Sequence, residues 1–116
     1  MKQLIEHFKV LSDENRFRIL MMLRIKPMCV CEILAVLDIA NSTLSSHLKI
    51  LKNNGFIRQH KDGRWIEYSV SDTPHIMKIL EMAETLIEDR TQIDADRDKA
   101  GKITRDICSS QKDRLL

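Results

Sequence analysis

Two cysteines separated by a single residue stand where a helix is about to begin. Residues 26–37 have the sequence KPMCVCEILAVL, in which Cys29 and Cys31 follow a proline and precede an apolar helical pattern. Cys29 and Glu32 occupy the first and last positions of the Ser/Thr-x-x-Glu capping box. A thiol is a poor cap, but the helix dipole favours a thiolate here, and the thiolate is the form that binds soft ions. The pattern therefore predicts that Cys29 and Cys31 bind a soft metal or metalloid ion.

The spacing of these cysteines indicates how such an ion would act. Side chains at i and i+2 do not face each other on a continuous helix, but they point to the same face of an extended backbone. Cys29 and Cys31 can therefore bind one ion together only if the first turn of the helix is unwound or displaced. The alternative is that both are small buried hydrophobic residues, as free cysteines often are.

Cys108 is the third thiol of the chain and lies near its C-terminal end. Three cysteines cannot pair completely among themselves, and thiols stay reduced in the cytoplasm, so the sequence favours ligation or thiol chemistry over a disulfide framework. Cys108 is a candidate ligand of the same ion, from either protomer of a dimer. The alternatives are a redox crosslink with Cys29 or Cys31, and an unpaired cysteine without a role.

The composition is that of one small soluble globular domain. Of the 116 residues, 43% are hydrophobic, 31% are charged and only 4% are aromatic, so we expect an aliphatic, methionine-containing core. The N-terminus lacks the apolar stretch of a secretory signal, and the longest apolar run, ILMML, is too short to span a bilayer, which indicates a cytoplasmic protein. With three glycines, no phosphate-binding glycine loop and no base at a catalytic spacing, the sequence does not predict an enzyme.

Hydrophobic periodicity predicts a mainly α fold. Apolar residues at helical spacing indicate a first helix over residues 2–11 and a second helix that is capped by Ser12 and stops before Pro27. A short third helix follows at residues 31–37.

A fourth helix and a hairpin complete the central part of the chain. We expect Asn41 or Ser42 to cap this helix, and the Asn-Gly pair at residues 54–55 to end it. Alternating residues on both sides of the Asp-Gly pair at residues 62–63 predict a two-stranded β-hairpin.

The remaining chain divides into a helix and a tail. Pro74 suits the first turn of a long helix that extends to about residue 90, with one apolar face. Residues 91–116 are rich in charges and poor in apolar side chains, so we expect a charged tail or a weakly packed helix there. Residues 1–90 are thus predicted to form the folded domain.

Basic side chains gather around the fourth helix and the hairpin. Residues 1–70 carry 11 basic and 7 acidic side chains, whereas residues 71–116 carry 8 basic and 10 acidic ones. A short helix, a tight turn, a second helix and a basic hairpin follow in the order of a winged helix-turn-helix, which predicts DNA binding at this face. A solvated basic surface is the alternative. The residues expected to contact DNA are Asn41, Ser42, Thr43, Ser45, Ser46, His47 and Lys49 on the helix, and Lys61 and Arg64 on the hairpin.

Three motifs together resemble the ArsR/SmtB family of metal-responsive bacterial repressors. They are LSDENRFRIL, CVCEILAVLDIANSTLSSHLKILKNNGFI and KDGRWIEYSV, and they follow the order and spacing of the family over roughly residues 5–90. The resemblance implies a homodimeric winged helix-turn-helix with five to six helices and a two-stranded wing. It also implies a repressor that binds operator DNA when empty and releases it when an inducer binds. On this pattern the helices at residues 2–11 and 75–90 form the dimer interface.

The resemblance also bears on the inducer. A Cys-Val-Cys at this helix is similar to the family's site for arsenic(III) or antimony(III), and to part of its cadmium/lead site. Some relatives have a further cysteine where this chain has Leu34, so the third ligand is Cys108, or else a hydroxide or small thiol. The cysteines of an N-terminal extension that the cadmium/lead site recruits are missing, and His75 has no second histidine on its helix for a zinc-type site. We therefore expect arsenic(III) or antimony(III), with a cadmium/lead-responsive or thiol-redox-sensing repressor as the alternative.

Overall fold

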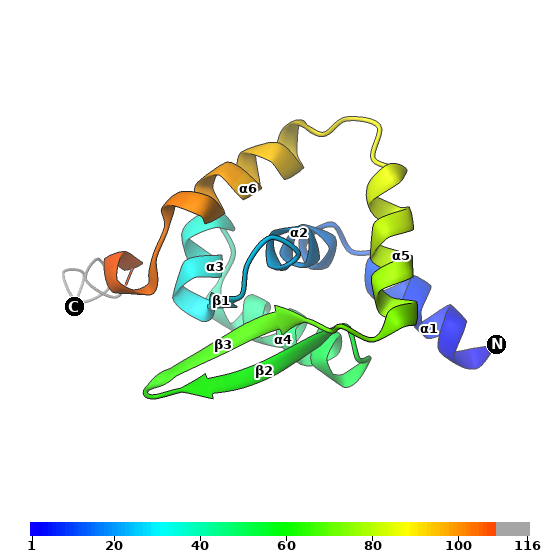
Figure 1. Ribbon diagram of the computed structural model, residues 1–116, viewed down its shortest axis with the longest axis horizontal. Coiled ribbons are helices and arrows are strands. Elements are labelled where there is room, and N and C mark those ends of the chain that lie inside the picture. The colour runs from blue at the N-terminus through cyan, green and yellow to red at the C-terminus, as the bar shows by residue number, and fades with distance from the viewer. Residues whose placement is uncertain (109–116) are drawn as a thin grey trace.

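The computed structural model describes residues 1–108 (Figure 1). Six helices and three strands follow along this part of the chain, and a helical turn at residues 105–108 comes after the last of them. Their bounds are α1 Lys2–Leu11, α2 Glu14–Leu23, β1 Met28–Cys29, α3 Val30–Val36, α4 Asn41–Asn53, β2 Ile57–Asp62, β3 Trp65–Val70, α5 Pro74–Thr85 and α6 Thr91–Lys102. The predicted order of helix, turn, helix and hairpin is confirmed.

Helix α2 lies at the centre of the molecule, framed by the other helices (Figure 1). Its last five residues, 19–23, are all buried. They pack with Leu44 and Leu51 from α4 and with Phe56, which are fully buried as well. The core is aliphatic and contains three fully buried methionines, as the composition predicted.

The start of α2 differs from the prediction in one residue. Asp13, not Ser12, is the N-cap, because its backbone is extended and its side chain accepts a hydrogen bond from the Arg16 backbone N–H at 3.0 Å. Ser12 instead belongs to the end of α1, where its hydroxyl donates to the Lys9 carbonyl at 2.6 Å. Aspartate adds a favourable negative charge at the positive end of the helix dipole.

The prediction of a cap by Asn41 or Ser42 is wrong. Helix α4 begins at Asn41, and its N-cap is Ala40, whose side chain has no polar atom to offer. The end of the helix is as predicted: Asn54 is the C-cap, and Gly55 follows with a φ of 77°, a left-handed conformation in which glycine is not strained.

The sheet has three strands instead of the predicted two. Strand β1 pairs antiparallel with β3, with Cys29 opposite Glu67, and the order in the sheet is β1-β3-β2. Pro27 disfavours helical backbone at the residue before it, and Met28 and Cys29 then extend along the free edge of β3. A strand of two residues has no alternation to reveal it, so the sequence did not predict it.

The hairpin connection is shifted by one residue from the predicted Asp-Gly pair. Asp62 and Trp65 are paired across the strands, so that Gly63 and Arg64 form the two-residue connection. Gly63 has a φ of 62°, which suits glycine at the first connecting position of a type II′ turn.

Helices α5 and α6 complete the described chain. Pro74 is in the first turn of α5, as predicted, but this helix ends at Thr85, before the expected residue 90. Helix α6 packs against α2 and α3 and buries Ile93, Asp96 and Ala100, so it is packed more firmly than its sequence indicated. Residues 109–116 of the predicted tail lie outside the described residues. Among residues 1–108, no helix has the length and apolar character that crossing a membrane requires.

Candidate thiol site and DNA-binding surface

The start of α3 positions the two central thiols differently. Cys29 is the last residue of β1 and the N-cap of α3, with an extended backbone, and it is only 2% exposed. Cys31 lies one residue inside the helix and is half-buried. The Glu32 carboxylate accepts a hydrogen bond from the Cys29 backbone N–H at 2.8 Å, which is the glutamate half of the predicted capping box.

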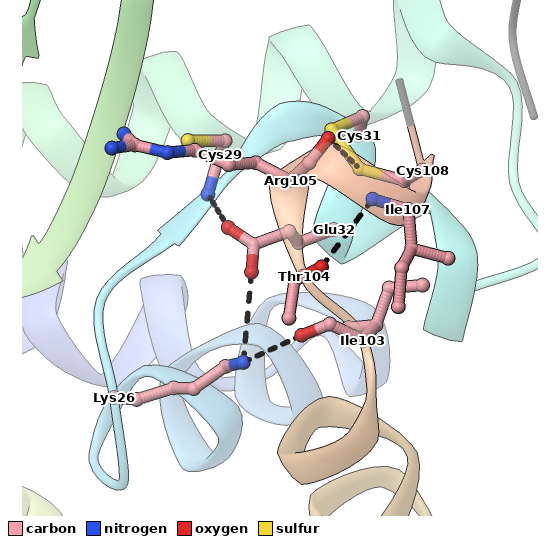
Figure 2. The surroundings of a disulfide bond; sticks show 9 residues. All are labelled: Lys26, Cys29, Cys31, Glu32, Ile103, Thr104, Arg105, Ile107 and Cys108. Atoms are coloured by element: carbon pink, nitrogen blue, oxygen red, sulfur yellow. Dashed lines mark hydrogen bonds and ion pairs between the residues drawn. A yellow bond between two sulfur atoms is a disulfide. The ribbon is translucent and has the colours of Figure 1, made fainter. Parts of the chain in front are cut away.

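Cys108 lies directly beside Cys31. The two form a disulfide, with 5.8 Å between their Cα atoms, that joins α3 to the helical turn after α6 (Figure 2). The sequence left open whether Cys108 would come from the same chain or from a partner. In the structure it is the Cys108 of the same chain that lies next to Cys31.

The Cys29 thiol points away from this pair, towards the Arg105 side chain (Figure 2). Burial raises the pKa of the Cys29 thiol, the Glu32 carboxylate raises it further, and the Arg105 guanidinium acts in the opposite direction. At Cys29, burial therefore outweighs the preference for a thiolate that the helix start predicted. Among the residues that the structure describes, no three His, Cys, Asp or Glu side chains are arranged to hold a metal ion. The structure therefore holds no preformed site for one ion among these thiols, and joint binding by them stays a prediction.

Two basic side chains hold the C-terminal turn in this place. Lys26 Nζ donates to the Ile103 carbonyl at 2.8 Å and lies 3.5 Å from Glu32 Oε2 (Figure 2). Arg105 Nη2 donates to Asp62 Oδ2 at the end of β2 at 2.9 Å. Lys26 and Arg105 were not predicted as site residues, because no short-range pattern marks contacts between residues 43 and 77 positions apart.

Most of the predicted DNA-binding side chains are exposed. On α4, six of the seven are exposed, and on the wing Lys61 and Arg64 are exposed near the hairpin connection. The exposed residues of α4 are Asn41, Ser42, Thr43, Ser45, Ser46 and Lys49. A groove of about 340 Å³ separates α4 from the wing, and Lys49, Lys52 and Gln59 are among the residues that line it.

His47 is the exception among these residues. Its side chain is buried against α2, where Nδ1 lies 3.5 Å from Arg16 Nη1 and Nε2 lies 3.9 Å from Asp13 Oδ1. It occupies the core side of α4, next to Leu48, because the apolar face of this helix is wide enough to include it. This position gives His47 a role in helix packing, whereas the other six predicted residues of α4 are exposed.

Comparison with known proteins gives a consistent result. Residues 13–59 match the sequence model described as "Bacterial regulatory protein, arsR family". Over 113 residues the chain is 31% identical to the "Arsenical resistance operon repressor" of Escherichia coli (strain K12), a match that covers 90% of this chain and 95% of the relative. It is also 35% identical over 77 residues to the "Cadmium resistance transcriptional regulatory protein CadC homolog" of Staphylococcus aureus, which covers 66% of this chain and 63% of that relative.

Solved structures share the fold. The AntR antimony-specific transcriptional repressor superposes with a TM-score of 0.64 and 29% identity, covering 78% of this chain and 82% of that one. The homodimeric winged helix-turn-helix DNA-binding domain of Mb0332 from Mycobacterium bovis superposes with a TM-score of 0.66 at 20% identity, covering 73% and 78%. At that identity the second match supports the fold alone.

Proposed function

The chain belongs to the arsR family of bacterial regulatory proteins and is a winged helix-turn-helix transcriptional repressor, and we propose that arsenic(III) or antimony(III) is its inducer. The expectation that it is not an enzyme is confirmed by this membership. We propose that the repressor is cytoplasmic and that, without an inducer, it binds operator DNA as a homodimer. When the inducer binds Cys29, Cys31 and Cys108, the repressor dissociates from the DNA.

The position of Cys108 is the observation that carries this proposal. A third thiol, 77 residues from Cys31 along the chain, lies directly beside it and close to the start of α3. Trivalent arsenic forms three bonds to sulfur, and sulfur-only ligand sets select soft ions. Arsenous acid, As(OH)₃, would exchange its three hydroxides for three thiolates, and the three thiol protons would leave with them as three water molecules.

Movement of α3 would transmit binding to DNA. The Cys29 sulfur and the Cys31–Cys108 pair point in different directions, so a shared ion has to pull the first turn of α3 out of its present position (Figure 2). Helix α3 is the first helix of the helix-turn-helix, and α4, the second, carries the exposed serines and Lys49. Displacement of α4 would lower DNA affinity, provided that the ion binds the displaced conformation more tightly.

Binding to DNA would depend on the basic side chains of α4 and the wing and on the small side chains at the start of α4. Small side chains in the first turns of α4 allow the backbone to approach base edges, and Lys49, Lys61 and Arg64 are available for phosphates. We therefore expect operator affinity to fall steeply with salt, as it does for proteins that neutralise several phosphates.

The thiol site can be tested by titrating reduced protein on the DNA upstream of its own gene. Arsenite and antimonite should dissociate the complex at lower concentrations than cadmium, lead or zinc. Cys29→Ser and Cys31→Ser should bind DNA as the wild type does and should remain bound when arsenite is added. Release of DNA by arsenite from a Cys29→Ser variant would contradict the proposed ligands.

A rescue experiment isolates the third ligand. Cys108→Ser should weaken the arsenite response, and adding Leu34→Cys to that variant should restore it. Residues 31 and 34 lie one helical turn apart on the same face of α3, so the new thiol replaces the missing one without the C-terminal turn. A Cys108→Ser variant with the full wild-type response would remove Cys108 from the ligand set.

The disulfide between Cys31 and Cys108 favours a second candidate, a thiol-redox-sensing repressor. In that case hydrogen peroxide would take two electrons and two protons from the two thiols, giving the disulfide and two water molecules. DNA release by peroxide without any metal, lost in Cys108→Ser, would support this function. A cadmium- or lead-responsive repressor is the remaining alternative, and the ion titration above separates it from an arsenic-responsive one.

A further inference from the structure

The turn that carries Cys108 also reaches the wing through one side chain. Arg105 Nη2 donates to Asp62 Oδ2 at 2.9 Å, and the Arg105 guanidinium carbon lies 5.5 Å from the centre of the Trp65 ring. Asp62 and Trp65 face each other across the last pair of the hairpin. Arg105 therefore contacts both residues that close the wing, next to the predicted DNA contacts at Lys61 and Arg64.

The same side chain also lies beside the thiol site (Figure 2). Arg105 Nη1 is buried and has no hydrogen-bond acceptor within the part of the chain that the structure describes. Figure 2 shows the guanidinium beside the Cys29 sulfur, and Cys108, three residues further along the same turn, is bonded to Cys31. One side chain thus lies between the candidate ligands and the wing.

We propose that Arg105 is a positioning residue through which the thiol site controls the wing. This inference rests on the proposed function, since it assumes that an inducer joins the thiols of α3 to Cys108. When an inducer joins Cys31 to Cys108, the C-terminal turn is held against α3, and Arg105 remains paired with Asp62. In the empty, reduced protein no bond to Cys108 fixes the turn, which is held instead by the noncovalent contacts of Lys26 and of Arg105 itself. Arg105 can then leave Asp62, and the wing can move to contact DNA.

The structure indicates which state the Arg105–Asp62 ion pair stabilises. The Arg105–Asp62 ion pair is present in the structure in which Cys31 and Cys108 are joined. An ion bound to both sulfurs would keep the same two elements together. We therefore assign the Arg105–Asp62 ion pair to every state in which Cys108 is joined to Cys31, including the loaded state, in which the first turn of α3 is displaced as well. The inducer then acts on two DNA-binding elements, α4 through α3 and the wing through Arg105.

Arg105→Gln and Asp62→Asn test this link through the ratio of operator affinities without and with saturating arsenite. The ratio cancels any effect that a variant has on both states alike. Each variant should reduce it about three- to tenfold, the factor expected for one charge-assisted contact that is partly shielded from solvent. The double variant should lose no more than either single one, because both changes remove the same contact. Lys102→Gln, which removes an exposed ion pair to Asp98 on α6, is the matched control and should retain the ratio.

Trp65 provides a readout that does not depend on DNA. It is the only tryptophan of the chain, and Arg64 and Arg105 both lie over its ring. Arsenite should change its fluorescence in the reduced wild type and in Lys102→Gln, but not in Arg105→Gln. The near-ultraviolet absorption of arsenic–sulfur bonds should show that all variants still bind the ion.

The outcomes separate the link from the function on which it rests. If arsenite binds wild-type protein without releasing DNA, the proposed function fails. If the wild type releases DNA while Arg105→Gln and Asp62→Asn retain the full affinity ratio and the fluorescence change, the link through Arg105 is wrong. Should Arg105→Gln fail to fold, Asp62→Asn decides alone, because Asp62 is exposed at the wing and its substitution leaves the core intact.

Discussion

At the scale of single residues, Cys29 and Cys31 are near neighbours in the sequence but differ in their surroundings. Cys29 is buried, and this burial raises the pKa of its thiol. Cys31 is more accessible and lies against Cys108. We therefore expect an inducer to engage Cys31 and Cys108 before Cys29, whose recruitment then moves α3.

The surroundings of Glu84 determine how much its charged carboxylate stabilises the fold. Its carboxylate accepts hydrogen bonds from Arg97 Nη1 at 2.8 Å and Nη2 at 2.9 Å, and it also pairs with Arg24 and Arg90. These contacts join α5 to α2 and α6. The Arg97 hydrogen bonds are the main reason why the pKa of Glu84 falls from 4.5 to about 2.

Glu84→Gln should remove a pH-dependent part of the stability. Because the folded-state pKa lies below the unfolded value, the stabilisation is complete above pH 4.5 and is lost as the pH falls towards 2. The side chain is 22% exposed, so after allowance for solvent screening we expect a loss of roughly 2 kcal/mol at pH 7. Urea unfolding of variant and wild type at pH 7, 4 and 2.5 should show this difference shrinking.

Glu88→Gln is the control for that measurement, since Glu88 is exposed in the segment after α5. It should cost less than about 0.5 kcal/mol at every pH. A difference between Glu84→Gln and wild type that is the same at pH 7 and pH 2.5 would show that the arginines do not stabilise the charged form of Glu84.

At the scale of elements, α6 is the part that brings Cys108 to α3. It is anchored by Arg18 of α2, whose Nε and Nη2 donate to the two carboxylate oxygens of Asp96 at 2.8 Å each. The Asp96 side chain is 3% exposed, so this pair is largely removed from solvent. Ile93 and Ala100 are buried on the same side of the helix. The anchor determines where the following turn, with Arg105 and Cys108, can reach.

Asp96→Ala should therefore affect both stability and inducer binding. It leaves the Arg18 guanidinium without its partner in a mostly buried position, which typically costs about 3 kcal/mol. With α6 loosened, arsenite affinity should fall to that of Cys108→Ser, while Cys29 and Cys31 remain. Urea unfolding and arsenite titration measure the two effects.

Asp98→Ala is the matched control on the same helix, because its partner Lys102 is exposed and the pair lies in solvent. It should change the free energy of unfolding by no more than about 0.5 kcal/mol. Full arsenite affinity in an Asp96→Ala protein that is shown to be destabilised would mean that α6 does not position Cys108.

The elements also show how far the sequence predicted the fold. Periodicity and turn residues predicted α1, α2, α4, the hairpin and α5, because each depends on local apolar spacing or on a glycine or proline with a local effect. Strand β1 was missed, since two residues carry no periodicity. The packing of α6 was underestimated because it depends on Arg18–Asp96, a contact between residues 78 positions apart, and on few apolar side chains.

The candidate site was predictable to a similar extent. Cysteine types and spacing singled out Cys29 and Cys31, and the exposed serines of α4 followed from its apolar stripe. That Cys108 of the same chain meets Cys31, and that Arg105 meets the wing, depends on where α6 directs the chain. Long-range placement of this kind has no signal in a single sequence.

At the scale of the whole molecule, α1 and α5 leave large apolar side chains uncovered. Leu4, Ile5 and Phe8 on α1 are 47–57% exposed, and Met77 and Met82 on α5 are more than half exposed. Figure 1 shows the two helices together on the side of the molecule away from the wing tip and the C-terminal turn. Apolar groups gathered in this way suit a partner surface, and these are the two helices expected to form the dimer.

Phe8→Glu should give a monomer that has lost most of its operator affinity, because a monomer cannot bind both half-sites of the operator at once. Light scattering gives the mass, and titration on operator DNA gives the affinity. Ile25→Glu introduces the same charge at another exposed apolar residue, 47% exposed in the turn after α2, and should leave a dimer. A Phe8→Glu protein that is still dimeric would show that the interface lies elsewhere.

The most direct test of the central claim is a crystal structure of the reduced protein loaded with arsenite. We predict arsenic bonded to the Sγ atoms of Cys29, Cys31 and Cys108 of one chain, with the first turn of α3 displaced from its position in Figure 2. Arsenic held at any other place, with Cys29 and Cys31 unbound and the start of α3 unchanged, would contradict it.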